Sequence, residues 1–315
     1  MPTPSAFVPH PDPWAIAVIA TSVLFGLVAG HIGGRLVPLF GPARPREHVP
    51  ADVHGGVSPG ADDGTTAGTD KAVAPPPAPR GDDEGPPPPR CPHCRAELVF
   101  CRWFPLVADR CFRIRGACPH CEQTVRSHPG VLVLAVLGAT LVGLTALRDP
   151  VWTPLWIPAG LWLVAVGAVL SVVDLRVQRL PDVIVRPSYP VAAALIAAAV
   201  LLPPGGPHLH RATDALIGMV LVTVLYWLLW RVRPGGLGFG DVKLSGLSGL
   251  YAGWAAGPLG ALTAVFWAFA AFSAVGLVLL ALRRLSHRDP FPLGPFMCAT
   301  ALATVLAARP LMPAL

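Results

Sequence analysis

A single carboxylate follows a run of glycines at the start of an apolar segment. Asp241 closes the pattern Gly-Gly-Leu-Gly-Phe-Gly-Asp, and the mostly apolar residues 242–254 follow it. A charged group at the border of a membrane costs about 2 kcal/mol or more unless it has a partner or water. A charged residue with this energetic cost is expected to have a chemical function, and its partner must come from elsewhere in the chain.

Two further acids lie close together near the end of another apolar segment. Asp182 follows Pro181 at the expected start of a helix, where a carboxylate caps or stabilises the first turn. Asp174 lies at the expected end of a helix, where the macrodipole disfavours an acid, so it is the preferred partner of Asp241. One carboxylate of such a pair could act as general base on a water while the other, protonated, polarises a peptide carbonyl. The alternative is that both acids form ion pairs with nearby Arg or Lys side chains.

Four cysteines form two Cys-x-x-Cys pairs, Cys91 with Cys94 and Cys118 with Cys121. The 23 residues between the pairs are close to the spacing of a zinc ribbon with four thiolate ligands. Two disulfides are the alternative, but they need an oxidising compartment, and the orientation derived below places these residues in the cytoplasm. We therefore expect a structural zinc ion in a module of residues 90–128.

The composition identifies an integral membrane protein. Of the 315 residues, 53% are hydrophobic and 13% are charged, whereas a soluble domain has about 25% charged residues. The apolar runs predict an all-α polytopic fold with eight transmembrane helices. The expected spans are residues 14–39, 129–147, 154–173, 185–202, 213–232, 242–254, 258–282 and 291–308. The net charge of +6 could attract nucleic acid, but the basic residues fall between the spans, so we attribute it to membrane orientation and expect no nucleic-acid partner.

The basic residues are distributed very unequally between the two sides of the membrane. All but three of the 24 Lys and Arg residues fall on one side, and the exceptions are Arg148, Arg211 and Arg309. The positive-inside rule makes the rich side cytoplasmic. The cysteine module and Asp241 are then cytoplasmic, and both termini lie outside a cell inner or plasma membrane.

The expected domains are an N-terminal transmembrane helix (1–40), a disordered Pro/Gly-rich tether (41–89), the cysteine module (90–128) and a seven-helix membrane domain (129–315).

These motifs resemble the prepilin peptidases, membrane aspartic proteases that cleave the leader peptide of type IV pilin-like and pseudopilin precursors. The resemblance is carried by Gly-x-Gly-x-Gly-Asp-x-Lys at 236–243, Asp-x6-Pro-Asp at 174–182, the cysteine segment 91–121 and the segment 291–296. It implies cleavage at the cytoplasmic membrane border by Asp174 and Asp241. Lys243 is expected to orient Asp241 electrostatically or to reach the membrane interface. The supporting residues are Gly238, Gly240, Lys243 and Asp182.

Many members of that family also methylate the new N-terminus with S-adenosylmethionine. This chain departs from the family pattern at residues 31–34, 103–105 and 128–132, in regions associated with methyl transfer, so we expect the peptidase activity and not methyl transfer with S-adenosylmethionine. Two other classes of function fit the sequence less well. A transporter would keep acids near the middle of its spans, and no expected span has an Asp or Glu at its centre. A non-enzymatic scaffold with a zinc-binding partner module would leave the paired aspartates unexplained. The sequence predicts no oligomeric state.

Overall fold

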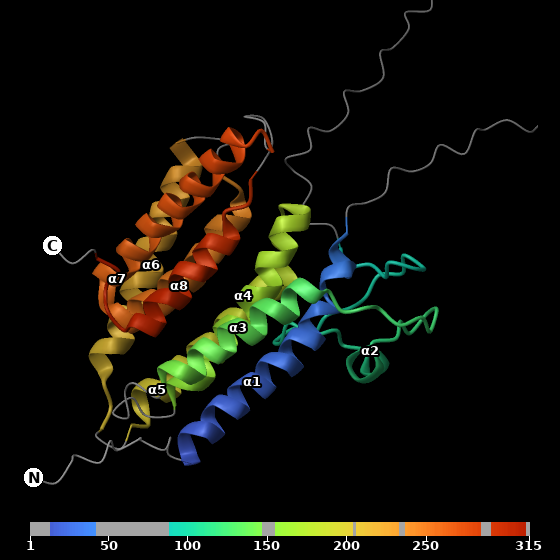
Figure 1. Ribbon diagram of the computed structural model, residues 1–315, viewed down its shortest axis with the longest axis horizontal. Coiled ribbons are helices and arrows are strands. Elements are labelled where there is room, and N and C mark those ends of the chain that lie inside the picture. The colour runs from blue at the N-terminus through green and yellow to red at the C-terminus, as the bar shows by residue number, and fades with distance from the viewer. Residues whose placement is uncertain are drawn as a thin grey trace, which may run out of the picture.

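Seven helices longer than ten residues and a small cysteine module make up the part of the chain that the computed structural model describes. That part comprises residues 13–41, 88–146, 155–203, 206–232, 237–284 and 291–312. The expected tether falls almost wholly outside it. The elements are α1 (Pro13–Gly34), the 3-10 helix η1 (Val37–Phe40), α2 (Arg110–Arg115), α3 (Pro129–Thr145), α4 (Trp156–Val177), α5 (Asp182–Leu201), α6 (Leu209–Val232), α7 (Phe239–Ala281) and α8 (Gly294–Ala307). Figure 1 shows the long helices packed into one bundle, with the module beside the end of α1.

Five helices in the described part are long and apolar enough to cross a membrane. Helices α1, α4, α5 and α6 correspond to the expected first, third, fourth and fifth spans. Helix α7 contains the expected sixth and seventh spans. Two shorter apolar helices, α3 and α8, occupy the positions of the second and eighth. The all-helical membrane architecture is confirmed, and the count of eight crossings stays a prediction.

Helix α7 contains two helices joined by a sharp turn. Ala256 has φ −141° and Gly257 has φ +70°, and Pro258 follows. The left-handed φ at Gly257 favours glycine, and Pro258 cannot donate the hydrogen bond that would continue the first helix. Gly249 and Val265, from the two sides of the turn, line the same cavity. The chain therefore folds back on itself at this point, as the separate spans 242–254 and 258–282 predicted.

Small residues bring the helices of the bundle into close contact. A Cβ added at Gly249 of α7 would lie 2.5 Å from the Gly218 carbonyl oxygen of α6. A Cβ at Gly26 of α1 would lie 2.8 Å from the Ala135 oxygen of α3. Without a hydrophobic driving force between helices in lipid, such close backbone packing is a main source of association. It holds α6 against α7, and it holds α1 against α3.

The cysteine module is attached directly to the ends of α1 and α3. The Arg90 N–H donates to the Leu39 oxygen at 3.0 Å, and the His128 N–H donates to the Gly34 oxygen at 3.0 Å. The rings of Phe40 and Phe100 are 6.0 Å apart. Within the module, α2 begins at a capping aspartate and ends at a glycine with φ +70°, a common way to start and stop a short helix.

Candidate active site

Asp174 is buried at the C-terminal end of α4, with 4% of its surface exposed. Its Oδ2 accepts a hydrogen bond of 2.9 Å from the backbone N–H of Gly294, the first residue of α8. The first N–H groups of a helix have no partner within the helix. The negative charge of Asp174 is disfavoured at the C-terminal end of α4. The hydrogen bond from the start of α8 offsets part of this cost.

Gly294 is a residue of the candidate site that the sequence analysis did not name. A Cβ at this position would lie 2.7 Å from Oδ2 of Asp174, so a larger residue would displace the carboxylate. Residues 291–296 contributed to the resemblance, but 120 positions separate Asp174 from Gly294. Nothing in the local pattern therefore links the two residues.

Asp241 lies in the first turn of α7, next to its N-terminal end. Gly238 is the N-cap with φ −71° and ψ 142°, and the Asp241 N–H donates to the Gly238 oxygen at 3.0 Å. The carboxyl groups of Asp241 and Asp174 lie close enough for their charges to interact. The structure thus brings together the two acids that the sequence analysis paired.

The glycines before Asp241 allow close packing. A Cβ on Gly240 would lie 3.2 Å from the Cβ of Leu180, in the short segment between α4 and α5. That segment begins at Gln178, a left-handed residue with φ +54° that caps α4. The chain therefore turns back immediately after the helix that carries Asp174 and passes against the glycine motif.

Lys243 pairs with Asp182 and not with Asp241, which corrects the expectation that it orients Asp241 directly. Its Nζ donates to both carboxylate oxygens of Asp182, at 2.7 and 2.8 Å. Arg186 contacts the same carboxylate at 3.2 Å, and the hydroxyl of Tyr189 donates to the Lys243 carbonyl oxygen at 2.5 Å. The contacts of Asp182 and Tyr189 with Lys243 join the N-terminal half of α5 to the N-terminal end of α7. Asp182 therefore does more than stabilise the start of its own helix.

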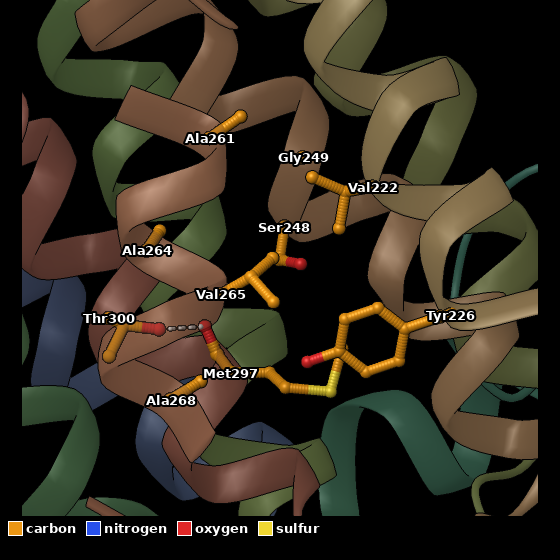
Figure 2. A pocket seen from close by; sticks show the side chains of 10 residues that line it. All are labelled: Val222, Tyr226, Ser248, Gly249, Ala261, Ala264, Val265, Ala268, Met297 and Thr300. Carbon is orange, nitrogen blue, oxygen red and sulfur yellow. Dashed lines mark hydrogen bonds between the residues drawn. The ribbon is translucent and has the colours of Figure 1, made fainter. Parts of the chain in front are cut away.

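A small pocket lies between α6, α7 and α8, and neither Asp174 nor Asp241 lines it. Figure 2 shows the Tyr226 hydroxyl and the Met297 side chain inside it. The candidate active site itself is the place where α4, α7 and α8 meet.

The four paired cysteines form a cluster that could hold a metal ion. Their sulfur atoms all lie within 4.8 Å of one another, with Cys91 to Cys121 at 3.9 Å and Cys94 to Cys118 at 3.7 Å. Four sulfurs in a tetrahedron around zinc, each about 2.3 Å from the ion, are about 3.8 Å apart. A disulfide needs about 2.05 Å, and all four thiols are free. The donor set therefore fits a tetrahedral metal and not two disulfides.

The two halves of the cluster have the same backbone geometry. The Arg95 N–H donates to the Cys91 oxygen at 3.0 Å, and the Glu122 N–H donates to the Cys118 oxygen at 2.9 Å. Both Arg95 and Glu122 are left-handed, with φ +60° and +58°. In each half, the N–H groups two and three residues after the first cysteine favour its thiolate, whereas burial has the opposite effect and raises the pKa of Cys91. Donors of this kind stabilise thiolates, the form in which cysteine binds a metal.

Comparison with known proteins identifies relatives of the membrane domain. Residues 161–314 match the model of a family described as the type IV leader peptidase family. The prepilin leader peptidases/N-methyltransferases of Burkholderia pseudomallei strains 1026b and K96243 are each 27% identical to this chain over 230 residues, which cover 70% of this chain and 67% of the relative. No solved structure matches. The family match includes Asp174, Asp182 and Asp241 and begins after the cysteine module.

Proposed function

Residues 161–314 form a domain of the type IV leader peptidase family, and on this premise we propose that the protein is a membrane aspartic endopeptidase. Its substrates are the precursors of type IV pilin-like proteins or pseudopilins, from which it removes the leader peptide. The observation that supports the aspartic mechanism is the pair of acids, Asp174 and Asp241, brought together from different helices with interacting charges.

The two acids have different surroundings, which support different roles. Asp174 already accepts the N–H of Gly294 at 2.9 Å, so it is suited to take a proton from an attacking water. Asp241 then carries the proton that the pair shares and donates it to the oxygen of the scissile carbonyl. Attack of the water oxygen on the carbonyl carbon gives a tetrahedral intermediate, and this breaks down when the leaving amine takes up a proton.

The position of the site supports cleavage at the cytoplasmic membrane border. The C-terminal end of α4 and the N-terminal ends of α7 and α8 meet at Asp174 and Asp241. Most Lys and Arg residues of the chain lie on this same side of the spans, which the positive-inside rule makes cytoplasmic. We propose eight crossings of the cell inner or plasma membrane, with the termini outside and the cysteine module in the cytoplasm.

Zinc is the metal that the cysteine cluster fits best. Thiolate ligands in a tetrahedral arrangement are typical of structural zinc. Cys91, Cys94, Cys118 and Cys121 would hold the ion and join the two halves of the module. The cluster offers four protein ligands, which leaves no position for a substrate or a water, so the ion has a structural role in this proposal.

A cleavage assay tests the proposed function. The full chain is co-expressed with a pilin-like precursor in membranes, and the shortened product is measured. Asp174→Asn and Asp241→Asn are each expected to lower the cleavage rate by about a hundredfold or more, since each removes a group that transfers a proton. Asp182→Asn should have a milder effect. Asp214→Asn, in the first turns of α6, is the matched control and should cleave normally. Full activity of Asp174→Asn or Asp241→Asn would refute the proposal.

The proposal covers cleavage and not methyl transfer. The relatives are named as N-methyltransferases as well as peptidases, but this chain departs from the family pattern around His31 and His128. If the cleaved product is incubated with S-adenosylmethionine that carries a labelled methyl group, we expect no label on its new N-terminus. Labelling in the presence of the wild-type protein would contradict this expectation and show that the protein both cleaves the precursor and methylates the product.

A further inference from the structure

The cysteine module carries large apolar side chains on its outside. Val99, Trp103, Phe104 and Ile114 are 74%, 65%, 51% and 67% exposed. They belong to residues 98–116, which form a turn closed by the bridge between Phe100 and Val107 and then the short helix α2. Exposed apolar residues concentrated in one part of a small module indicate a surface with a partner.

The same residues 98–116, called here the basic-aromatic stretch, carry a strong positive charge. The guanidinium of Arg102 lies over the Trp103 ring, 5.7 Å from its centroid. Asp109 is the only acid of the stretch, and its carboxylate accepts the N–H of Phe112 at 2.9 Å as the cap of α2. The four arginines are all exposed: Arg102, Arg110, Arg113 and Arg115.

The stretch is held next to a helix that is long and apolar enough to cross a membrane. Arg35, at the end of the candidate span Trp14–Phe40, packs on Gly116 at the end of α2, where an added Cβ would lie 2.7 Å from the guanidinium carbon. Phe100 of the stretch contacts Phe40. Figure 1 shows α2 beside α1. The basic-aromatic stretch therefore stays near the level at which α1 leaves the membrane.

We propose that the basic-aromatic stretch lies on the membrane surface and binds anionic lipid headgroups. Arginine guanidiniums bind phosphate groups, and tryptophan and phenylalanine prefer the headgroup level. Each basic residue near an anionic surface contributes about 1 kcal/mol, and burial of the apolar side chains adds to it. The surface orients the cysteine module relative to the bilayer. This inference does not depend on the proposed peptidase activity.

The test measures the surroundings of Trp103 in the full-length protein. The protein is placed in nanodiscs of phosphatidylcholine alone or mixed with phosphatidylglycerol, each containing a lipid with a nitroxide on its headgroup. The chain has nine tryptophans, so the signal of Trp103 is the difference between the wild type and Trp103→Phe. We expect this difference emission to be blue-shifted and quenched by the nitroxide in the anionic discs, and to be less so in the neutral discs or at high salt.

A second measurement tests the arginines. Native mass spectrometry of the protein released from anionic discs should show fewer retained phosphatidylglycerol molecules for Arg102→Gln/Arg110→Gln/Arg113→Gln than for the wild type. Arg90→Gln is the matched control, because Arg90 is an exposed arginine of the same module that pairs with Glu97 at 2.9 Å. It should retain lipid as the wild type does.

Three results would overturn the proposal. The first is emission of Trp103 typical of indole in water, without quenching, in both kinds of disc. The second is quenching of Trp103 that appears only after a precursor protein is added, because this would make the stretch a protein-binding surface. The third is equal lipid retention by the triple variant and the wild type.

Discussion

At the scale of single residues, the contact between Asp174 and Gly294 best explains how the proposed active site is held. The Asp174 carboxylate is buried, and its described hydrogen bond comes from the first N–H of α8. A helix start offers such a donor without a charged side chain. The absence of a Cβ at Gly294 is what allows the carboxylate to approach it.

Gly294→Ala is expected to lower the cleavage rate about tenfold or more, because overpacking of a buried contact costs about 1–3 kcal/mol and here moves the carboxylate. The matched control is Gly276→Ala in α7, where the nearest atom to an added Cβ is 3.9 Å away. That variant should cleave at the wild-type rate. Equal rates for both variants would show that the Gly294 contact does not position Asp174.

Two left-handed residues in the cysteine module provide a second prediction at this scale. Arg95 and Glu122 have φ near +60°, a conformation that costs a residue with a side chain about 1 kcal/mol relative to glycine. Arg95→Gly and Glu122→Gly should therefore each retain zinc about fivefold more tightly against a competing chelator. His93→Gly, in the same turn but without a positive φ, should not. Weaker retention in both substituted proteins would contradict this explanation.

The sequence named the candidate site residues but not the contacts that position them. Both acids were singled out because a charge is unfavourable at the membrane border, for Asp241, and at a helix C-terminus, for Asp174. The spacing of the cysteines predicted the cluster. The contact of Lys243 was not predicted. The resemblance suggested that it orients Asp241, with the membrane interface as the alternative, whereas its ammonium group contacts the Asp182 carboxylate. Contacts across 61 or 120 positions depend on how helices pack, and a single sequence does not contain that information.

At the scale of helices, the ion pair between Asp182 and Lys243 joins α5 to α7. Both side chains are about one quarter exposed, so the pair is shielded more than a surface ion pair. Lys243 lies two residues after Asp241. Asp182 directly follows the segment between α4 and α5 that packs on Gly240. The ion pair therefore holds the glycine motif before Asp241 against the segment that joins α4 to α5.

Lys243→Gln is expected to lower the thermal unfolding midpoint by several degrees, because it removes the partly buried ammonium group that pairs with the partly buried Asp182 carboxylate. The double variant Asp182→Asn/Lys243→Gln should recover part of the loss, since two amides can hydrogen-bond to each other. Arg186→Gln, which removes the partner that is 75% exposed, should change the midpoint little. A double variant no more stable than Lys243→Gln would argue against the ion pair as the link.

Helix bounds show where the apolar pattern is a good guide and where it is not. The turn at Ala256 and Gly257 followed from Gly257 and Pro258, which are strong local signals. The C-terminal end of α4 lies several residues beyond the expected span, since Asp174 to Val177 are helical although part of them is polar, whereas α5 begins at Asp182, where Pro181 and Asp182 predicted a helix start. Hydropathy marks the membrane-embedded part of a helix, whereas backbone hydrogen bonds continue until a cap such as Gln178 ends them.

At the scale of the whole molecule, the cysteine module packs against the end of α1 and the start of α3, and we propose that it folds as a unit of its own. Its core is small, and a small domain commonly depends on a metal for stability. The proposed zinc ion should therefore determine whether the module is folded, while the membrane helices keep their own packing.

We expect the purified protein to contain one zinc ion per chain. Removal of the metal, or Cys91→Ser with Cys118→Ser, should make residues 90–125 sensitive to protease, because structural zinc contributes folding free energy directly. The matched control is Cys111→Ser, an exposed cysteine outside the cluster, which should keep the metal. A module that stays resistant to protease without metal would contradict a structural role for zinc.

The central claim, that Asp174 and Asp241 act as one catalytic unit, is tested most directly by cleavage rates of three variants under the same conditions. These are Asp174→Asn, Asp241→Asn and the double variant. Because the two acids share one proton transfer, each single change should abolish nearly all activity, and the double variant should be no slower than either. Losses that multiply in the double variant, or substantial cleavage by either single variant, would contradict the account.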